Sequence, residues 1–491
     1  MMKPVNMPPD APTLMWSTRA IGYTTPAAVA DLIDNSVSAN ASRISIQFMS
    51  GEKSYVSILD DGNGMSQDEL RIAMKYGSRN PLQERSASDL GRFGLGLKTA
   101  SLSQCKRLTV VSKKDSQMSA YCWDLDHVLL AESWELLELE EEDILSLPQI
   151  DNLKKLNEGT IVLWDKLDKI FAGDEDKEHG LLLRIKEVEE HLALTFHRYL
   201  QGEPGLKKLT ITSNGIPIKP IDPFYIAKSD ELPSEKIPVR YSSATGSSAI
   251  DNVVVTPYIL PFSDALSQGE LDALGGKEGL IKNQGFYIYR NKRLIVAADW
   301  FRLTRKTDLT KLCRVKVDMP NTLDEIWTID VKKSMALPPE VVLRNLRRIV
   351  APIVKAGKRK YKFRAVKETT SENTPIWVPQ ETRNGIVYSI NTDYPILRDI
   401  LAETTDKRKL QTLLRILEQN IPVNAIHTDF YDDKKFAFED VDIAYQNVLE
   451  NLRNLLQDIP PEQREDEFND LMSIMPFAEY DIKFTDLGDI I

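Results

Sequence analysis

Residues 24–38, Thr-Thr-Pro-Ala-Ala-Val-Ala-Asp-Leu-Ile-Asp-Asn-Ser-Val-Ser, constrain the fold of this chain more than any other segment. They predict a helix, because Thr25 is a suitable N-cap and Pro26 suits the first helical position. At about 100° per residue, one stripe is apolar and would face a core: Val29, Leu32, Ile33 and Val37. Asp31 and Asn35 fall on the opposite stripe, one turn apart. Taken alone, that polar stripe is typical of a solvated helix face.

Two later segments change this interpretation. Residues 55–65, Tyr-Val-Ser-Ile-Leu-Asp-Asp-Gly-Asn-Gly-Met, predict a strand that ends in Asp60 and two glycines that let the backbone approach a ligand. Residues 91–101, Gly-Arg-Phe-Gly-Leu-Gly-Leu-Lys-Thr-Ala-Ser, offer N–H groups and a helix start to phosphate. Their glycine spacing matches neither the dinucleotide fingerprint nor the P-loop. Each motif is weak alone, whereas the three in this order indicate a nucleotide site.

The three segments resemble the nucleotide-binding boxes of the GHKL ATPases: Asp31-Leu32-Ile33-Asp34-Asn35, Asp60-Asp61-Gly62-Asn63-Gly64 and Gly91-Arg92-Phe93-Gly94-Leu95-Gly96. Together with Tyr76-Gly77-Ser78-Arg79, they are most similar to the MORC and MutL-like branch and its prokaryotic members. The resemblance implies an α/β (α+β) fold. Residues 1–203 would form a GHKL (Bergerat) ATP-binding α/β sandwich with an N-terminal arm. An α/β transducer domain (204–367) would follow, and then a linker and mainly helical C-terminal domain (368–491).

The resemblance also implies roles for individual residues. Asn35 would hold Mg²⁺, Asp60 would accept a hydrogen bond from the adenine amino group, and Thr160 would touch Asp60. Asp31 stands where the family's water-activating carboxylate is usually a glutamate, so the base is one methylene shorter here. The predicted ATP-binding residues are Asn35, Asp60, Gly62, Gly64, Met65, Gly91, Arg92, Phe93, Gly94, Leu95, Gly96, Leu97, Lys98 and Thr160.

The predicted transducer domain contains two recognisable segments. Residues 284–295 resemble a hairpin of the MORC and MutL transducer, and residues 328–334 predict a strand that ends in a lysine pair. A transducer lysine of this superfamily often reaches the γ-phosphate, so Lys333 is predicted to be catalytic, with Lys332 as the alternative. An ordinary surface lysine pair is the competing interpretation.

Positive charge is concentrated late in that domain. Residues 282–367 contain 22 Lys or Arg against 7 Asp or Glu, although the whole chain carries a net charge of −11. Residues 344–364 are basic, lack acidic residues and include interleaved aromatics, which is typical of a surface that contacts nucleic-acid phosphates. No base-reading motif is present, so binding to double-stranded DNA would be largely independent of sequence. The alternative interpretation is that this basic surface contacts the acidic C-terminal region of the same protein or a protein partner.

Length and composition set the remaining limits. A chain of 491 residues with 42% hydrophobic and 27% charged residues predicts several soluble domains. No apolar run approaches the roughly 18 residues of a membrane span, and the proline-rich start is not a signal peptide. Three scattered cysteines favour a reducing cytoplasm, and the five histidines show no zinc-ligand spacing.

The rest of the chain gives coarser predictions. Residues 1–23 are expected to be an extended arm, either exchanged between subunits or frayed, and residues 78–90 a lid over the nucleotide. Strands are predicted at 43–49, 107–111, 118–123, 159–164, 206–213, 253–261, 285–290 and 294–296. One helix is predicted to start at Ser66 with a capping box. Further helices are predicted at 181–200 and 440–456 and in the region from 394 onward. Residues 132–143 predict an acidic insertion and 368–380 a linker.

These features together predict an ATP-hydrolysing, ATP-gated dimeric clamp on DNA. By analogy, such a clamp would act in prokaryotic defence or repair, beside a nuclease or helicase partner. The alternative is a nucleotide-switched scaffold or a chaperone-like ATPase that acts on a protein without DNA. A sensor histidine kinase is disfavoured because no histidine precedes residue 127.

Overall fold

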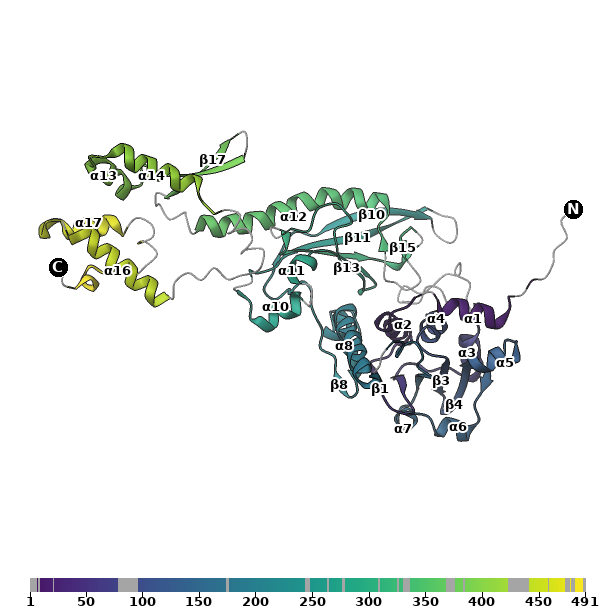
Figure 1. Ribbon diagram of the computed structural model, residues 1–491. Helices are drawn as coiled ribbons and strands as arrows, with labels where there is room; N and C mark the ends of the chain where they lie inside the picture. Colours follow the sequence, from purple (N-terminus) through teal and green to yellow (C-terminus); the bar gives the residue numbers. More distant parts are fainter. Residues whose placement is uncertain are drawn as a thin grey trace. The chain divides into compact units, whose positions relative to one another are not determined.

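The computed structural model describes residues 7, 9–20, 22–77, 96–173, 176–242, 248–262, 265–275, 279–307, 310–324, 326–329, 336–367, 376–382, 385–422, 441–457, 459–472, 477 and 482–488. The chain divides into two compact units, residues 1–357 and 358–491. Within the described ranges, no helix combines the length and the apolar character that a membrane span requires. Figure 1 labels the elements along the chain.

The first unit begins with a mixed sheet to which eight of the described strands belong. Their order across the sheet is β5 (Leu137–Glu138), β4 (Gln117–Asp124), β3 (Arg107–Lys114), β6 (Gly159–Asp165), β2 (Tyr55–Asp60), β1 (Arg43–Met49), β7 (Thr210–Ser213) and β8 (Ile216–Pro217). Neighbouring strands are antiparallel except β1 and β7, which are parallel. The strands predicted at 43–49 and 55–60 are confirmed with the same bounds.

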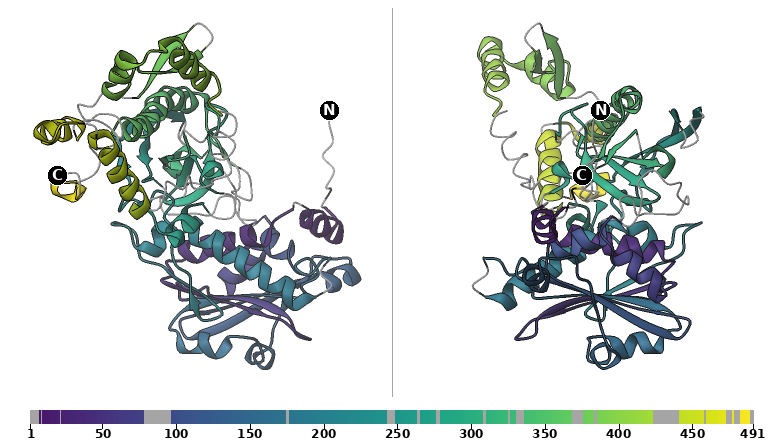
Figure 2. Two further views of the ribbon diagram at one scale, coloured as in Figure 1. Left: turned by 60° about the vertical axis from the view of Figure 1, so that its left-hand side comes forward. Right: turned by 90° about the vertical axis from the view of Figure 1, so that its right-hand side faces the viewer.

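Both faces of this sheet are covered. Alternate residues along its strands point to opposite sides, and the side chains on each side pack in a core. Ile58 belongs to the larger core under the helices, whereas its neighbour Leu59 packs in a smaller core on the other face. The helices of the larger core are α1 (Ala11–Arg19), α2 (Thr25–Ser38), α3 (Gln67–Met74), α4 (Gly96–Leu102), α5 (Leu125–Ala131), α8 (Lys177–Thr195) and α9 (His197–Gln201); α6 (Glu141–Leu145) and α7 (Ile150–Lys155) cover the other face. Figure 2 shows helices of the larger core, drawn in purple, lying on one side of the strands. The predicted α/β sandwich is confirmed.

Helix α2 is central to the larger core. Val29, Leu32 and Ile33 are at most 2% exposed, as the apolar stripe predicts. The N-cap, however, is Thr24 rather than Thr25: Thr24 Oγ1 accepts from Ala27 N at 3.4 Å. Thr25 Oγ1 instead donates to Gln104 at 2.8 Å, so a tertiary contact decides between two adjacent threonines.

The prediction of an extended arm over residues 1–23 is wrong for residues 11–19, which form α1. Asp10 caps this helix by accepting from Thr13 N at 2.9 Å, and Met15 is fully buried. Arg19 donates to Leu102 O and pairs with Asp168 at 2.6 Å. These partners lie far along the chain, so local periodicity could not reveal a helix that docking stabilises.

The second sheet follows in the same unit and contains the predicted hairpin. Its strands are β10 (Glu235–Ser242), β11 (Ser248–Ile259), β14 (Cys313–Met319), β12 (Gly285–Arg290) and β13 (Arg293–Asp299) in order, with β9 (Asp230–Glu231) pairing to β11. Every residue of β12 is buried, and its tyrosines pack with Phe224. Short helices α10 (Gln268–Gly275) and α11 (Gly279–Lys282), the 3₁₀ turn η4 (Asn321–Leu323) and the strand pair β15 (Thr328–Ile329) and β16 (Ala336–Leu337) complete this region.

Strand β7 corrects one prediction. Residues 206–213 were expected among the strands of the transducer, but Thr210–Ser213 pairs with β1 in the first sheet. The parallel pairing joins residues more than 160 positions apart, as in Ile44 with Ile211, and leaves no local trace in the sequence.

The basic segment forms one long helix, α12 (Glu340–Lys367), which starts in the first unit. Val342, Leu346 and Ile349 are buried on one side of it, and Arg348 pairs with Glu235 of β10 at 3.1 Å. The second unit then contains β17 (Trp377–Thr382), β18 (Gly385–Ile390), α13 (Pro395–Glu403), α14 (Lys407–Gln419), α16 (Val441–Gln457), η5 (Pro461–Gln463), α17 (Arg464–Leu471) and η7 (Phe484–Leu487). The β17–β18 hairpin replaces part of the predicted linker, while the helices from 395 and at 441–457 agree with the sequence.

Candidate functional site

Asp60 ends β2 and lies at the buried end of the site. Its side chain is 6% exposed; Oδ2 accepts from Ser36 Oγ at 2.7 Å and Oδ1 from Gly62 N at 2.9 Å. Burial raises the pKa of the Asp60 carboxyl. The hydrogen bonds from Ser36 and Gly62 act in the opposite direction and reduce this increase. The carboxylate is therefore held in one orientation as a buried acceptor, which suits an amino group of a ligand.

The two glycines after Asp60 are required by close backbone contacts. A β carbon at Gly62 would lie 2.9 Å from Ala39 Cβ, and one at Gly64 would lie 2.1 Å from Lys113 O. Gly64 also has a φ of +59°, which side chains disfavour. The close approach in this structure is thus to the end of helix α2 and to strand β3, and the predicted approach to a ligand stays a prediction.

Thr160 faces this end of the site from β6. It is paired with Asp60 in the register of β2 and β6, and its hydroxyl lies 2.9 Å from Ser112 Oγ of β3. Met65 N donates to the same Ser112 oxygen at 2.8 Å. The predicted neighbours Asp60, Thr160 and Met65 therefore come together around strands β2, β3 and β6.

Asp31 and Asn35 lie on α2 toward the other end of the site. Asp31 is 3% exposed, and its Oδ2 accepts from Tyr23 OH at 2.9 Å. A β carbon at Gly96, the first residue of α4, would lie 3.8 Å from the same oxygen. Asn35 is exposed, one turn further along α2. The carboxylate thus faces the start of the helix that follows the predicted phosphate loop.

The second sheet also reaches Asp31. Arg293 of β13 places Nη2 3.9 Å from Asp31 Oδ1 and Nε 3.2 Å from Asp34 Oδ1. All three side chains are at most 4% exposed. A residue of the predicted transducer therefore lies beside the predicted catalytic carboxylate.

Lys98 does not extend into solvent. It is 1% exposed, and its Nζ donates to Ala73 O at the end of α3, 2.7 Å away. Leu97 is half-buried at the start of α4. The remaining phosphate-loop residues Gly91, Arg92, Phe93, Gly94 and Leu95, the lid (78–90) and the lysines Lys332 and Lys333 lie outside the described residues, so their roles stay predictions.

Sequence reasoning missed four residues of the site: Tyr23, Asp34, Ser36 and Arg293. Ser36 gave a usable signal, because it lies seven residues after Val29 and so on the apolar stripe of α2, where a polar side chain needs a partner. Arg293 gave none, since it was read as part of the turn between β12 and β13.

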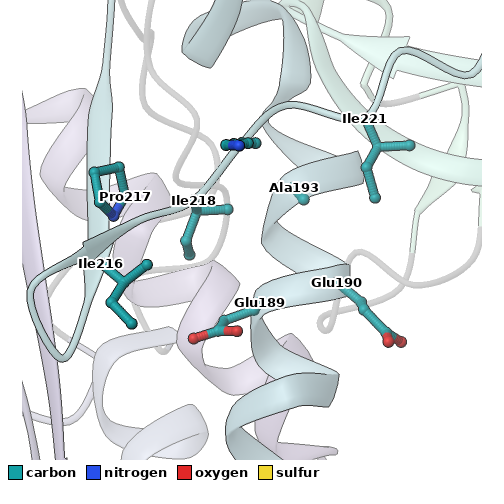
Figure 3. Close-up of a pocket in the computed structure, with 8 residues that line it drawn as sticks. Glu189, Glu190, Ala193, Ile216, Pro217, Ile218 and Ile221 are labelled. Carbon is teal, nitrogen blue, oxygen red and sulfur yellow. The ribbon is translucent and has the colours of Figure 1, made fainter. Parts of the chain in front are cut away.

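A separate groove of about 220 Å³ lies between α8 and residues 216–221 (Figure 3). Figure 3 shows Glu189, Glu190 and Ala193 of α8 opposite the chain that runs from Ile216 to Ile221. None of its lining residues belongs to the predicted nucleotide site.

Comparisons with known proteins bear on the same region. Residues 23–160 match the family described as histidine kinase-, DNA gyrase B- and HSP90-like ATPase. A stretch of 88 residues is 30% identical to the DNA mismatch repair protein MutL of Thermosipho melanesiensis, covering 18% of this chain and 16% of that protein. MutL of Pseudoalteromonas translucida is 37% identical over 99 residues (19% and 16%). ATPase morc-1 of Caenorhabditis elegans is 30% identical over 95 residues (19% and 11%). The matched stretches thus span less than a fifth of these relatives' own length.

Proposed function

We propose that this protein binds ATP and hydrolyses it with Asp31 as the general base, because residues 23–160 match the histidine kinase-, DNA gyrase B- and HSP90-like ATPase family. The observation that carries the proposal is the position of α2. One face of this helix directs Asp31 toward Gly96, while Ser36 of the same helix fixes Asp60. A single rigid element thus connects the adenine-binding end to the hydrolytic end, as in-line attack on a bound nucleotide requires.

The residues present fit ATP and Mg²⁺. Asp60 offers a buried acceptor to the adenine amino group, beside glycines that leave no side chain in the way. Asn35 offers an exposed amide oxygen on α2, a ligand type that suits a magnesium ion that keeps several waters. When bound, the ion neutralises charge on the phosphates.

Asp31 would act on the attacking water. Its carboxylate must be ionised to take a proton, and Tyr23 holds one of its oxygens in place. The phosphate loop and Lys98 would surround the phosphates, and Lys333, or Lys332 in its place, would contact the γ-phosphate from the transducer. The shorter stem of Asp31 predicts slow turnover.

We further propose that ATP binding closes two copies into a dimeric clamp on double-stranded DNA. The support is the outer side of α12, where Arg344, Arg347 and Lys355 are exposed opposite the buried residues of the same helix. The helix continues through the basic residues 358–364. Such a stripe matches a run of backbone phosphates. The relative named a DNA mismatch repair protein is consistent with a DNA ligand. A nuclease or helicase partner and a role in defence or repair remain part of this proposal by analogy.

The proposed setting is the cytoplasm. Cys105, Cys122 and Cys313 are each buried, and none of them is joined in a disulfide, which fits a reducing compartment.

One experiment tests the central proposal. Turnover and molecular mass are measured together, with ATP and with a non-hydrolysable analogue, in the presence and absence of duplex DNA. We expect slow ATP turnover and a shift from monomer to dimer with the analogue. A dimer shift without turnover would instead favour a nucleotide-switched scaffold. The absence of both turnover and a dimer shift would overturn the proposal.

A second experiment tests the DNA ligand by gel shift at two salt concentrations. Affinity should fall with a slope of about −0.9 in log K against log salt for each neutralised phosphate. Reversing Arg344, Arg347 and Lys355 to Glu should weaken binding and leave ATP affinity unchanged. The matched control reverses Lys53, Lys155 and Lys169, three exposed lysines of the ATPase domain, and should bind DNA like the wild type. If the α12 variant binds DNA as tightly as the control variant and the wild type, the basic stripe of α12 would be assigned to a protein partner instead.

A further inference from the structure

Helix α2 buries two carboxylates on one side. Asp31 and Asp34 are three residues apart, hence neighbours on the helix surface, and they are 3% and 0% exposed. Two like charges at this depth repel each other and have lost most of their hydration. A nearby positive charge offsets this repulsion.

Arg293 provides that charge from the second sheet. Its Nε lies 3.2 Å from Asp34 Oδ1 and its Nη2 3.9 Å from Asp31 Oδ1. Nη1 donates to Leu294 O at 3.0 Å, and the guanidinium lies 5.9 Å from the centre of the Phe196 ring. The group is thus held on several sides and directed at the carboxylate pair.

Among the described residues, His191 and Tyr199 are two titratable neighbours of this cluster that stay neutral near pH 7. Burial, together with the charge of Arg293, lowers the pKa of His191 of α8 to about 4. Burial and the nearby Asp34 raise the pKa of Tyr199 of α9 to about 12. Tyr23 acts on Asp31 as a hydroxyl donor. Arg293, the described cation at the pair, thus comes from a hairpin, β12–β13, that belongs to a different sheet.

We propose that Arg293 is a positioning residue for ATP hydrolysis: its guanidinium, which pairs with Asp34 and lies 3.9 Å from Asp31, holds the Asp31 carboxylate in place and favours its charged form. This inference rests on the proposed role of Asp31 as the base. It follows that any displacement of the β12–β13 hairpin relative to α2 changes the charge that Asp31 experiences. The second sheet would then control hydrolysis without touching the nucleotide.

The test is ATP turnover as a function of pH in the full-length protein. In Arg293→Gln the cation is lost, so the pKa of Asp31 should rise, and its base form should disappear at higher pH than in the wild type. We expect kcat to fall about tenfold or more and the acidic limb of the pH profile to move up by about one pH unit. KM for ATP should change less than about threefold, since Asp60 is untouched.

Two companion variants should not raise the acidic limb as Arg293→Gln does. Arg293→Lys retains the charge, so it should keep the acidic limb of the wild type and recover part of the rate. Asp34→Asn removes a like charge beside Asp31, so the acidic limb should move to lower pH. The double variant Arg293→Gln/Asp34→Asn keeps the charge balanced, and it therefore remains a test if Arg293→Gln alone does not fold. Its limb should return toward that of the wild type while kcat stays reduced.

Arg290→Gln is the matched control. Arg290 belongs to the same hairpin, is 3% exposed at its side chain, and pairs at 2.6 Å with Asp324, which directly follows η4. Its loss should lower thermal stability without moving the acidic limb. The inference is overturned if Arg293→Gln, or the double variant, shows wild-type kcat and pH profile while Asp31→Asn is inactive. It is also overturned if Arg290→Gln moves the limb equally. A wild-type chain that does not hydrolyse ATP overturns the proposed function as well, which separates the two failures.

Discussion

Asp60 and Asp31 mark two ends of one site, and both are buried, yet they are held in different ways. Asp60 takes its hydrogen bonds from Ser36, 24 residues away, and from Gly62, two residues away. Asp31 is held by Tyr23, which comes just before α2, and it lies beside Arg293, whose pairing with Asp34 spans 259 residues. Among the described residues, the proposed adenine-binding end is therefore held by contacts within the first sheet and its helices, whereas the proposed hydrolytic end also contacts the second sheet.

This difference separates binding from hydrolysis. An end built from one sheet is formed as soon as that sheet folds, so nucleotide binding should not depend on the second sheet. An end built from two sheets can be switched by their relative position, which suits an enzyme that couples turnover to closure. Substitutions at the two ends should accordingly affect different kinetic quantities.

The largest expected effect is at the hydrolytic end. Asp31→Asn keeps the shape of the side chain but removes the base, so turnover should fall by about 10²-fold or more while ATP still binds. Stopped assays for phosphate release, paired with calorimetry of ATP binding, measure both quantities. Turnover like that of the wild type would make Asp31 structural and remove the contrast between the two ends.

The next effect belongs to the adenine-binding end. In Asp60→Asn the ligand loses a charged acceptor, worth about 1.5–3 kcal/mol, and the amide adds a misplaced donor. ATP affinity should therefore fall by at least tenfold, and turnover would fall only as far as binding does. If calorimetry finds the affinity unchanged, Asp60 does not belong to the site.

The same contrast explains how far sequence reasoning could go. Strands β1, β2 and β12 and the capping box at Ser66 were predicted correctly because alternation and capping are local signals. Helix α1 and the pairing of β7 with β1 were missed, since both depend on contacts with distant residues. The β17–β18 hairpin was missed because Pro379 and the polar residues beside it indicate a linker more strongly than a strand.

Within the site, sequence predicted residues that would touch the nucleotide but not those that hold them. Asp31, Asn35 and Asp60 were predicted from their motifs, and their contact with a nucleotide stays a prediction. Tyr23 and Arg293 act through Asp31 and its neighbour, and a partner 259 residues distant from Asp34 leaves no spacing to recognise. The residues predicted to react can thus be recognised from short local motifs, whereas the residues that support them electrostatically become visible only in the tertiary structure.

Removal of one hydroxyl at the hydrolytic end should have a smaller effect. Tyr23→Phe deletes the hydrogen bond to Asp31 Oδ2 but keeps the ring, which is 8% exposed and part of the core. Because that bond fixes the orientation of the base, kcat should fall by about tenfold. ATP affinity should not change, and single-turnover kinetics would distinguish the two. A loss of affinity as large as the loss of rate would mean that Tyr23 contacts the nucleotide.

Ser36→Ala is the corresponding change at the adenine-binding end and should have the smallest effect. It deletes the hydroxyl donor to Asp60 Oδ2 and leaves the bond from Gly62 N, so ATP affinity at pH 8 should fall by only about fivefold. The sign of the pH dependence is the sharper test. Burial already raises the pKa of Asp60, and binding needs its ionised form, so affinity is present above that pKa and lost as pH falls through it. Ser36 favours the ionised form, so its loss raises the pKa further, and affinity should begin to fall at a higher pH than in the wild type. Titration calorimetry from pH 5 to 8 measures this, with Tyr23→Phe as the control that should follow the wild-type curve. A shift to lower pH, or the same shift in both variants, would show that the two ends are not electrostatically separate.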